Sequence, residues 1–397
     1  MKKQVSMIPK GFLFSTAEAA IKTPGRKDLA LIYSEAEANI AGAFTTNKIK
    51  AAPVKLDIKK IRSGRGQAIV VNSGNANACT GKKGIQDAVD MVRLIADGLN
   101  IKPSLVYICS TGVIGMPMPM DRIIPKTSGL IANLGSSSME DVAKAIMTTD
   151  TFPKIINKRV KIGGRTGSIA GICKGAGMIW PDMATMLCFI MTDIAVNHKT
   201  LDKALKDAVK GSFNTITIDG DRSTNDTVLI MANGVLGNPQ ITEKSESYIA
   251  FKKALSEVAL ELSRLIVKDG EGASKFIEVE VKGARNKSHA EKAAFAVANS
   301  NLVKTAIYGN DANWGRIMAA LGYSGIPIKE EKVDINFGKV RIVNKGLGTG
   351  KDKEANEVLK RKDIKIIIDL HLGRSSAKVL TCDLTEEYIK VNAAYRT

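Results

Sequence analysis

The chain has 397 residues, of which 44% are hydrophobic and 25% are charged. This length predicts two or three packed units, and the composition excludes collagen-like, coiled-coil and wholly disordered chains. The formal net charge is +18, and residues 1–184 carry +13 of it, with 26 Lys and Arg against 13 Asp and Glu.

The sequence indicates a cytoplasmic protein without a membrane span. The most apolar stretch, residues 178–191, contains Pro181 and Asp182 and is shorter than the roughly 18 to 20 residues that cross a bilayer. The N-terminus has no secretory apolar region. Five cysteines without a close pair and three scattered histidines predict neither a disulfide framework nor a zinc site. We therefore expect all five cysteines to be reduced core residues, and no metal.

Short β-rich runs alternate with amphipathic helical segments along the chain. In the first half the pattern predicts strands at 67–72, 105–109 and 167–173, and helices at 86–99 and from Ser138 onward. In the second half it predicts helices at 200–210, 245–267 and 290–304, and strands at 276–281, 332–343 and 364–370. The last strand is almost continuously apolar, which is typical of a central position. We therefore expect an α/β or α+β chain with strand-rich layers and helices outside.

A glycine-rich segment, residues 344–356 (NKGLGTGKDKEAN), resembles a phosphate-binding loop only superficially. The spacing GxxxxGK[ST] would need glycine at Lys345 and Ser or Thr at Asp352. The segment is therefore predicted to be an exposed hairpin loop.

The most unusual segment is residues 174–193, KGAGMIWPDMATMLCFIMTD. Lys174 precedes a Gly-Ala-Gly turn, and the pair Ala184-Thr185 enters an apolar run rich in methionine. Periodicity alone favours a buried strand that follows a glycine turn.

This segment is similar to the most diagnostic stretch of the ornithine acetyltransferases of arginine biosynthesis, the ArgJ family, KGxGMIxPxMATML. Nine further segments resemble the family in the same order: AGAFTTNKIKAAPV (41–54), NSGNANACTG (72–81), STGVIG (110–115), TTDT (148–151), SFNTITIDGDRSTNDT (212–227), KDGEGASKF (268–276), YGNDANWGRI (308–317), CDLT (382–385) and NAAYRT (392–397). Ten collinear segments make the resemblance specific over nearly the whole chain. Two positions depart from it, since the family more often has Asn at Asp182 and Ser is common at Ala176.

The resemblance implies an N-terminal-nucleophile-like fold: a layered αββα sandwich followed by smaller α/β units. The expected domains are a catalytic domain at 1–200, a small helical and β unit at 201–275, and a C-terminal α/β domain at 276–397. The resemblance also implies that the chain cleaves itself between Ala184 and Thr185. The fragments 1–184 and 185–397 are expected to stay associated as an α2β2 heterotetramer.

The resemblance assigns the nucleophile to Thr185. Once Thr185 begins a new chain, its α-amino group can accept the hydroxyl proton, because such amines titrate near 7.7 to 8.0. Thr111 and Gly112 are the implied donors to the oxyanion of the acyl-transfer intermediate. Without the resemblance, these two residues would be interpreted as a turn after the strand at 105–109.

The family pattern also implies the residues that bind substrate. They are Thr148, Lys174, Thr185, Glu271, Asn392 and Thr397. Lys174 suits the α-carboxylate shared by acetylornithine and glutamate. Glu271 has two open roles, since it either contacts the substrate or orients the Thr185 amine. For Asn392 and Thr397 the alternative is a frayed chain end.

The implied reaction transfers acetyl from N2-acetyl-L-ornithine to L-glutamate through an acetyl-threonine enzyme. No cofactor is implied, and acetyl-CoA is expected to be at most a minor second donor. One alternative is a self-processing aminopeptidase on the same scaffold, in which water is the acceptor. Another is a non-catalytic basic nucleic-acid-binding protein, which the 5% aromatic content and the lack of an RNA-binding signature disfavour.

Overall fold

The computed structural model describes residues 8–180 and 186–394, which form two compact units. The first unit contains residues 8–175, 186–214 and 222–266, and the second contains 176–180, 215–221 and 267–394. Most of the predicted middle segment, 201–275, therefore falls in the first unit. The division into domains at 1–200, 201–275 and 276–397 stays a prediction.

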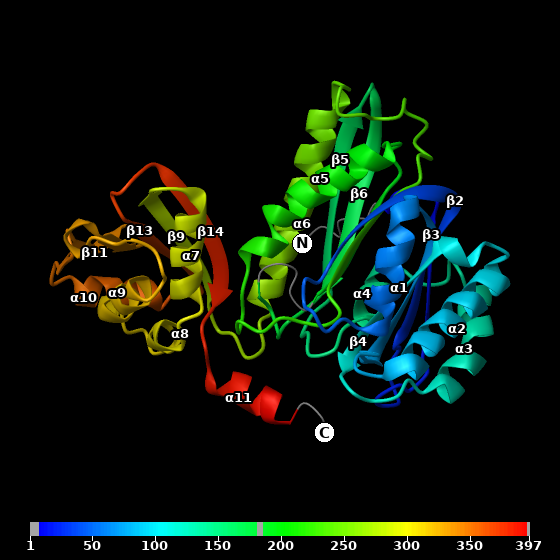
Figure 1. Ribbon diagram of the computed structural model, residues 1–397, viewed down its shortest axis with the longest axis horizontal. Coiled ribbons are helices and arrows are strands. Elements are labelled where there is room, and N and C mark those ends of the chain that lie inside the picture. Colours follow the sequence, from blue (N-terminus) through cyan, green and yellow to red (C-terminus); the bar gives the residue numbers. More distant parts are fainter. Residues whose placement is uncertain (1–7, 181–185, 395–397) are drawn as a thin grey trace. The chain divides into compact units, whose positions relative to one another are not determined.

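The first unit is built on one eight-stranded hydrogen-bonded sheet of order β4-β3-β2-β8-β7-β6-β5, with β1 paired to β2 (Figure 1). Its strands are β1 (Phe12–Ala17), β2 (Leu29–Phe44), β3 (Arg65–Asn75), β4 (Val106–Val113), β5 (Lys154–Ile162), β6 (Arg165–Lys174), β7 (Leu187–Thr192) and β8 (Thr227–Ala232). The three strands predicted in this half correspond to β3, β4 and β6.

Strand β2 joins two halves of this sheet: one half contains β1, β3 and β4, and the other contains β5, β6, β7 and β8. Residues 29–33 pair with β1 and β3, residues 39–44 pair with β8, and the register shifts between Tyr33 and Ala38. One core cluster contains Ile32 of the first half together with Phe189 of the second half. The sheet thus bends into two β-layers that share an interior.

Helices cover the outer faces of the two layers. They are α1 (Ala52–Lys60), α2 (Gly81–Leu99), α3 (Met120–Ala132), α5 (His198–Lys210) and α6 (Ser247–Lys268). Helix α4 (Met139–Ala145) instead packs Met139 and Val142 into the cluster that contains Ile32 and Phe189. Ile95 of α2 and Ile123 of α3 share a cluster with Val70 of β3. On the other layer α6 approaches β6 so closely that a Cβ on Gly171 would lie 2.7 Å from Leu262 Cδ1. The predicted αββα layering is therefore confirmed (Figure 1).

Local sequence signals explain where two of these helices begin. Ser138 caps α4, because its hydroxyl accepts the Asp141 N–H while the Asp141 carboxylate accepts the Ser138 N–H. Helix α2 begins at Gly81, five residues before the predicted start at 86. Its buried face includes Ala88, Val92 and Ile95, as the helical period predicts.

The second unit contains a six-stranded sheet of order β12-β11-β10-β13-β9-β14. Its strands are β9 (Phe276–Ala284), β10 (Asp334–Phe337), β11 (Val340–Asn344), β12 (Leu347–Gly348), β13 (Asp363–Asp369) and β14 (Ser375–Cys382). The helices of this unit are α7 (Lys287–Ala298), α8 (Asn301–Tyr308), α9 (Trp314–Gly322), α10 (Asp352–Leu359) and α11 (Glu386–Ala393). The apolar strand β13 lies inside the sheet, parallel to β9, so its predicted central position is confirmed.

Two predicted elements of this unit are wrong. The helix at 290–304 is divided, because α7 ends at Ala298 and Ser300 caps the new helix α8 by accepting the Val303 N–H at 3.4 Å. The strand at 332–343 is a hairpin, in which Gly338 takes a left-handed φ of 55° between β10 and β11. The predicted loop at 344–356 contains the short strand β12 and the beginning of α10.

Among the described residues, the helices are too short or too polar to form a membrane span. Short 3-10 helices cover Ile61–Ser63, Pro103–Leu105, Phe213–Thr215 and Glu330–Lys332.

Candidate active site

Lys174 contacts two other residues that the sequence predicts as functional, Thr111 and Thr148. It ends β6, pairs with Leu187 of β7 and is only 3% exposed. Its ammonium donates a 2.7 Å hydrogen bond to Thr148 Oγ1 and a longer one, 3.4 Å, to Thr111 Oγ1. The first unit therefore places one buried cation against two hydroxyl groups.

The geometry at Thr111 and Gly112 suits donation to an anion. Because Thr111 Oγ1 accepts from Lys174, the Thr111 hydroxyl hydrogen can be donated to another group. Gly112 has a φ of 135°, and a Cβ at this position would clash with the backbone of Gly74. Only glycine fits here, at the end of β4 where its parallel neighbour β3 also ends.

A buried amide network fixes the end of β4. The Asn225 side chain donates to the carbonyl of Ser110 at 2.8 Å and to that of Ala76 at 2.7 Å. The Ser110 hydroxyl donates to Asn72 Oδ1 at 2.5 Å. Residues from two other family-like segments, 72–81 and 212–227, thus hold Ser110, the residue before Thr111, in place.

Asp150 supplies the negative charge beside Lys174, and the sequence analysis missed it. Asp150 Oδ1 accepts from Lys154 Nζ at 2.7 Å and from the Gly175 N–H at 2.6 Å, while Oδ2 lies 3.8 Å from Lys174 Nζ. Burial opposes ionisation of this carboxyl, but the Lys174 and Lys154 charges outweigh it and lower the pKa of Asp150 to about 2. Asp150 is therefore ionised near neutral pH. Its only sequence signal was its place in TTDT (148–151).

The backbone at the start of β7 is held by Asp226, which the sequence analysis also missed. Asp226 Oδ1 accepts the Met186 N–H at 3.0 Å, and the Thr227 N–H donates to the Met186 carbonyl at 3.1 Å. Burial raises the pKa of Asp226 well above its usual value, although the Met186 N–H and the Lys174 charge act against this shift. The predicted nucleophile Thr185 and its neighbour Ala184 lie outside the described residues.

Two other predicted residues meet within the second unit. Asn392 of α11 donates a 2.8 Å hydrogen bond to Glu271 Oε2, although 121 positions separate them in sequence. The Glu271 N–H donates to the Ala176 carbonyl at 2.8 Å, and a Cβ on Gly177 would clash with the Glu271 carboxylate. The chain end is thus folded back onto Glu271 as far as Asn392. Thr397 lies outside the described residues.

The described part of the chain has no cluster of three or more His, Cys, Asp or Glu side chains arranged to hold a metal ion. The five cysteines form no disulfide, and four of them are buried. Cys79 is exposed, so the prediction that all five are core residues is wrong at this position.

Comparisons with known proteins identify the family. The ArgJ family profile matches residues 13–397. The arginine biosynthesis bifunctional protein ArgJ of Geobacter sulfurreducens is 54% identical over 390 residues, which cover 98% of this chain and 99% of that protein. Its namesake from Caldanaerobacter subterraneus is 50% identical over 395 residues, covering 98% of each. A crystal structure of the ArgJ protein of Bacillus halodurans matches with 44% identity and a TM-score of 0.51, covering 52% of this chain and 98% of that one. The chain therefore belongs to the ArgJ family.

Proposed function

We propose that this protein is a cytoplasmic glutamate N-acetyltransferase of arginine biosynthesis, which moves acetyl from N2-acetyl-L-ornithine to L-glutamate through an acetyl-Thr185 enzyme. The main supporting observation is the buried Lys174 ammonium against the hydroxyls of Thr111 and Thr148. Lys174 pairs with Leu187, only two residues after Thr185 in the chain. The names of the relatives support a role in arginine biosynthesis.

The proposed nucleophile becomes active by cleavage of the Ala184-Thr185 bond. The new α-amino group of Thr185 accepts the proton of its own hydroxyl as the oxygen attacks the acetyl carbonyl. The Thr111 hydroxyl and the Gly112 N–H donate to the tetrahedral oxyanion. When the intermediate collapses, the ornithine amine takes the proton and leaves, and the acetyl group remains as an ester on Thr185.

The second half-reaction regenerates the enzyme. The α-amine of glutamate attacks the acetyl-Thr185 ester, passes its proton to the Thr185 oxygen and leaves as N-acetylglutamate. In this proposal the reaction needs no metal ion and no cofactor. Both substrates carry an α-carboxylate, for which Lys174 is the proposed partner, and Asp150 keeps Lys174 in position.

The second unit is proposed to contribute Glu271 and Asn392, which are already hydrogen-bonded to each other. Glu271 has the same two roles open as before, contact with substrate or orientation of the Thr185 amine. Thr397 completes the proposed set of substrate contacts.

Cleavage after Ala184 predicts fragments of 184 and 213 residues that remain associated as α2β2. The Bacillus halodurans protein supports this division, because 98% of its solved chain matches only 52% of the present one. A solved family chain is thus about half as long as this sequence. That length is the one expected for a fragment of a divided enzyme.

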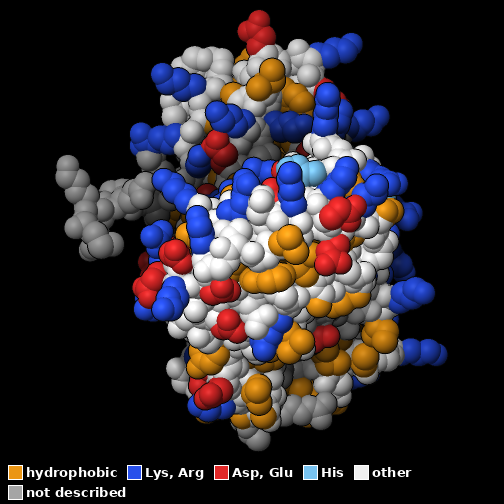
Figure 2. All heavy atoms as spheres, turned by 90° about the vertical axis from the view of Figure 1, so that its left-hand side faces the viewer, with side chains coloured by type: hydrophobic (Ala, Val, Ile, Leu, Met, Phe, Trp, Pro, Cys, Tyr) orange, Lys and Arg blue, Asp and Glu red, His pale blue; other side chains and the backbone are white. Residues whose placement is uncertain are grey.

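The face shown in Figure 2 does not favour the nucleic-acid-binding alternative. Figure 2 shows lysine and arginine side chains scattered over the visible face, with acidic side chains among them. A nucleic-acid-binding surface is typically a continuous basic patch or stripe. The basic excess is better explained as a solvated surface that attracts anionic metabolites.

Thr111→Val tests the oxyanion assignment. We expect kcat to fall by roughly 10- to 1,000-fold with little change in KM, because the lost hydroxyl acts on charge that develops in the transition state. Steady-state kinetics with acetylornithine and glutamate measure both constants. Thr148→Val is the matched control, since Thr148 also binds Lys174 and is assigned to substrate binding, so KM is expected to rise there. A higher KM with normal kcat in Thr111→Val would make Thr111 a binding residue.

The reaction itself is tested by assaying glutamate acetylation with each donor in turn. We expect a much larger kcat/KM for acetylornithine than for acetyl-CoA. The word "bifunctional" in the names of the relatives supports a second activity. Both activities are expected to disappear in Thr185→Ala. Comparable kcat/KM values for the two donors would contradict the proposed preference, and loss of only one activity would show two separate sites.

A further inference from the structure

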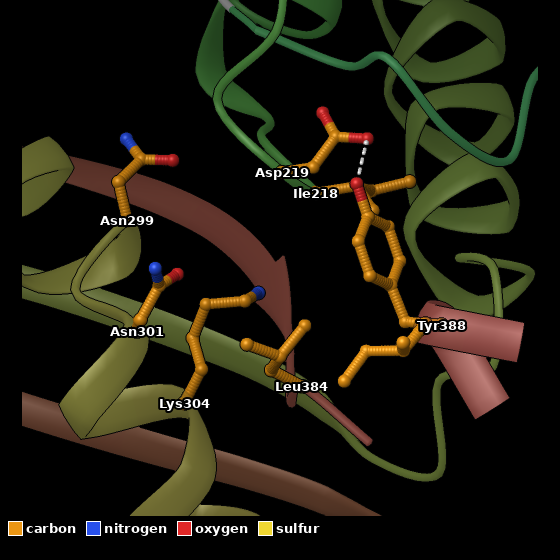
Figure 3. Close-up of a pocket in the computed structure, with 8 residues that line it drawn as sticks. Ile218, Asp219, Asn299, Asn301, Lys304, Leu384 and Tyr388 are labelled. Atoms are coloured by element: carbon orange, nitrogen blue, oxygen red, sulfur yellow. Dashed lines mark hydrogen bonds between the residues drawn. The ribbon is translucent and has the colours of Figure 1, made fainter. Parts of the chain in front are cut away.

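The second unit contains a cavity of about 270 Å³ that none of the predicted substrate residues line (Figure 3). Its lining residues are Ile218, Asp219, Asn299, Asn301, Lys304, Leu384, Tyr388 and Ile389. They come from the segment before β8, from α8 with the residues preceding it, and from α11 with the residues preceding it. The volume is sufficient for a small organic molecule.

Lys304 places a buried positive charge at this cavity. Lys304 lies in the first turn and a half of α8 and is 3% exposed. Its ammonium donates to Thr381 Oγ1 at 3.1 Å, to the Cys382 carbonyl and, at 3.8 Å, to Cys382 Sγ, but no carboxylate of the described residues lies within 4.0 Å of it. The contact to sulfur is the weakest of the three, so a ligand carboxylate can replace it. A buried ammonium without a counter-ion is costly, so such a group beside a cavity indicates an anion site. In Figure 3 the ammonium end points across the cavity toward Tyr388.

The remaining walls define the rest of the ligand. Asn301 is the first residue of α8 and is exposed, so its side-chain amide is accessible to a ligand in the cavity. The helix N-terminus adds a partial positive charge on the same side. Ile218, Leu384 and Ile389 offer apolar surface. The cavity thus combines a cationic, hydrogen-bond-donating end with an aliphatic wall.

The acidic residue in the cavity does not offer a competing cation site. Asp219 accepts the N–H groups of Met178 at 2.6 Å and Ile179 at 2.9 Å, and the Tyr388 hydroxyl donates to it at 3.2 Å. The Asp221 N–H donates to it as well, so both carboxylate oxygens already accept two hydrogen bonds each. The oxygens of Asp219 are therefore already used within the protein, and Lys304 is the cationic group that lines the cavity.

We propose that this cavity is a binding site for a small aliphatic carboxylate, whose carboxylate binds Lys304 and Asn301 and whose chain packs on Leu384 and Ile389. None of the predicted acetyl-transfer residues is among those that line the cavity. Its occupant would contact Tyr388, four positions before Asn392 on the same helix α11. The proposal does not depend on the proposed acetyltransferase function.

Isothermal titration calorimetry of the full-length protein with sodium pentanoate tests the site. We expect saturable binding of pentanoate and none of pentylammonium chloride, which has the same aliphatic chain and the opposite charge. Lys304→Met and Asn301→Asp are each expected to weaken binding at least about tenfold, as loss of a charge-assisted hydrogen bond predicts. Asn301→Asp is the decisive variant if Lys304→Met does not fold, because a carboxylate at a helix N-terminus favours the helix while repelling the anion.

Lys174→Met distinguishes this site from the carboxylate site of the proposed enzyme. We expect it to bind pentanoate like the wild type. Loss of binding in Lys174→Met would show that the measured heat comes from pentanoate binding to Lys174 in the first unit, and it would overturn the proposal. The same conclusion would follow if the wild type did not bind pentanoate, if pentylammonium bound equally well, or if Asn301→Asp left the affinity unchanged.

Discussion

Thr185→Ala is expected to remain a single chain of 397 residues and to lose acetyl transfer by at least about 10⁴-fold, because both the attacking oxygen and the released amine depend on this threonine. Denaturing electrophoresis measures the cleavage, and the glutamate acetylation assay measures the activity. The start of β7 is held by the backbone contacts of Met186 to Asp226 and Thr227, which the substitution leaves in place. The variant should therefore fold as an intact precursor.

Thr185→Ser is the matched control for this experiment. It retains a hydroxyl, so we expect cleavage and measurable transfer, both at reduced rates. A Thr185→Ala protein that is cut at the normal position would show that another group performs the cleavage. An uncut Thr185→Ala protein with normal activity would remove Thr185 from the reaction.

Asp150→Asn is expected to reduce the free energy of unfolding by about 3 to 5 kcal/mol, because it leaves the buried ammonium groups of Lys154 and Lys174 without their shared counter-ion. The Lys154 side chain is fully buried in this pair. The same change should lower kcat/KM, since Lys174 would lose the charge that positions it. Urea denaturation followed by circular dichroism measures the loss of stability.

The pH dependence of stability identifies the cause of that loss. The pKa of Asp150 is lowered to about 2 in the folded protein, so its stabilising contribution is complete above the unfolded value near 4 and disappears as the pH falls from about 4 to 2. Asp150→Asn should therefore lose less stability than the wild type across this window. Asp141→Asn is the control, since Asp141 is an exposed helix-capping residue and its replacement should cost only about 1 kcal/mol. Equal losses in the two variants would contradict the assigned role of Asp150.

Strands and helices with a clear period could be predicted from the sequence, whereas those shaped by tertiary packing could not. The segments 245–267 and 364–370 correspond closely to α6 and β13. Strand β2 was missed because its first residues are buried on both faces: Leu29 and Leu31 belong to the cluster with α2, while Ala30 and Ile32 belong to the shared interior. Such a segment has no alternation for a sequence pattern to detect.

The residues of the candidate site could likewise be predicted only in part from the sequence. The convergence of Thr111, Thr148 and Lys174 followed from the resemblance to the ArgJ family and not from spacing. Asp150 was missed because its importance depends on strand register: the pairing of Lys154 with Cys173 brings a second lysine beside Lys174. One sequence does not indicate that pairing. The same holds for Asp226, whose contact to Met186 depends on the parallel pairing of β7 with β8.

Self-cleavage is tested most directly by the intact mass of the purified wild-type protein under denaturing conditions. Cleavage between Ala184 and Thr185 predicts two species, with the masses of residues 1–184 and 185–397, that elute together before denaturation. Sequencing of the larger fragment should begin at Thr185. A single species of 42.5 kDa in a preparation that transfers acetyl from acetylornithine to glutamate would contradict the proposed self-cleavage and the use of the Thr185 amine.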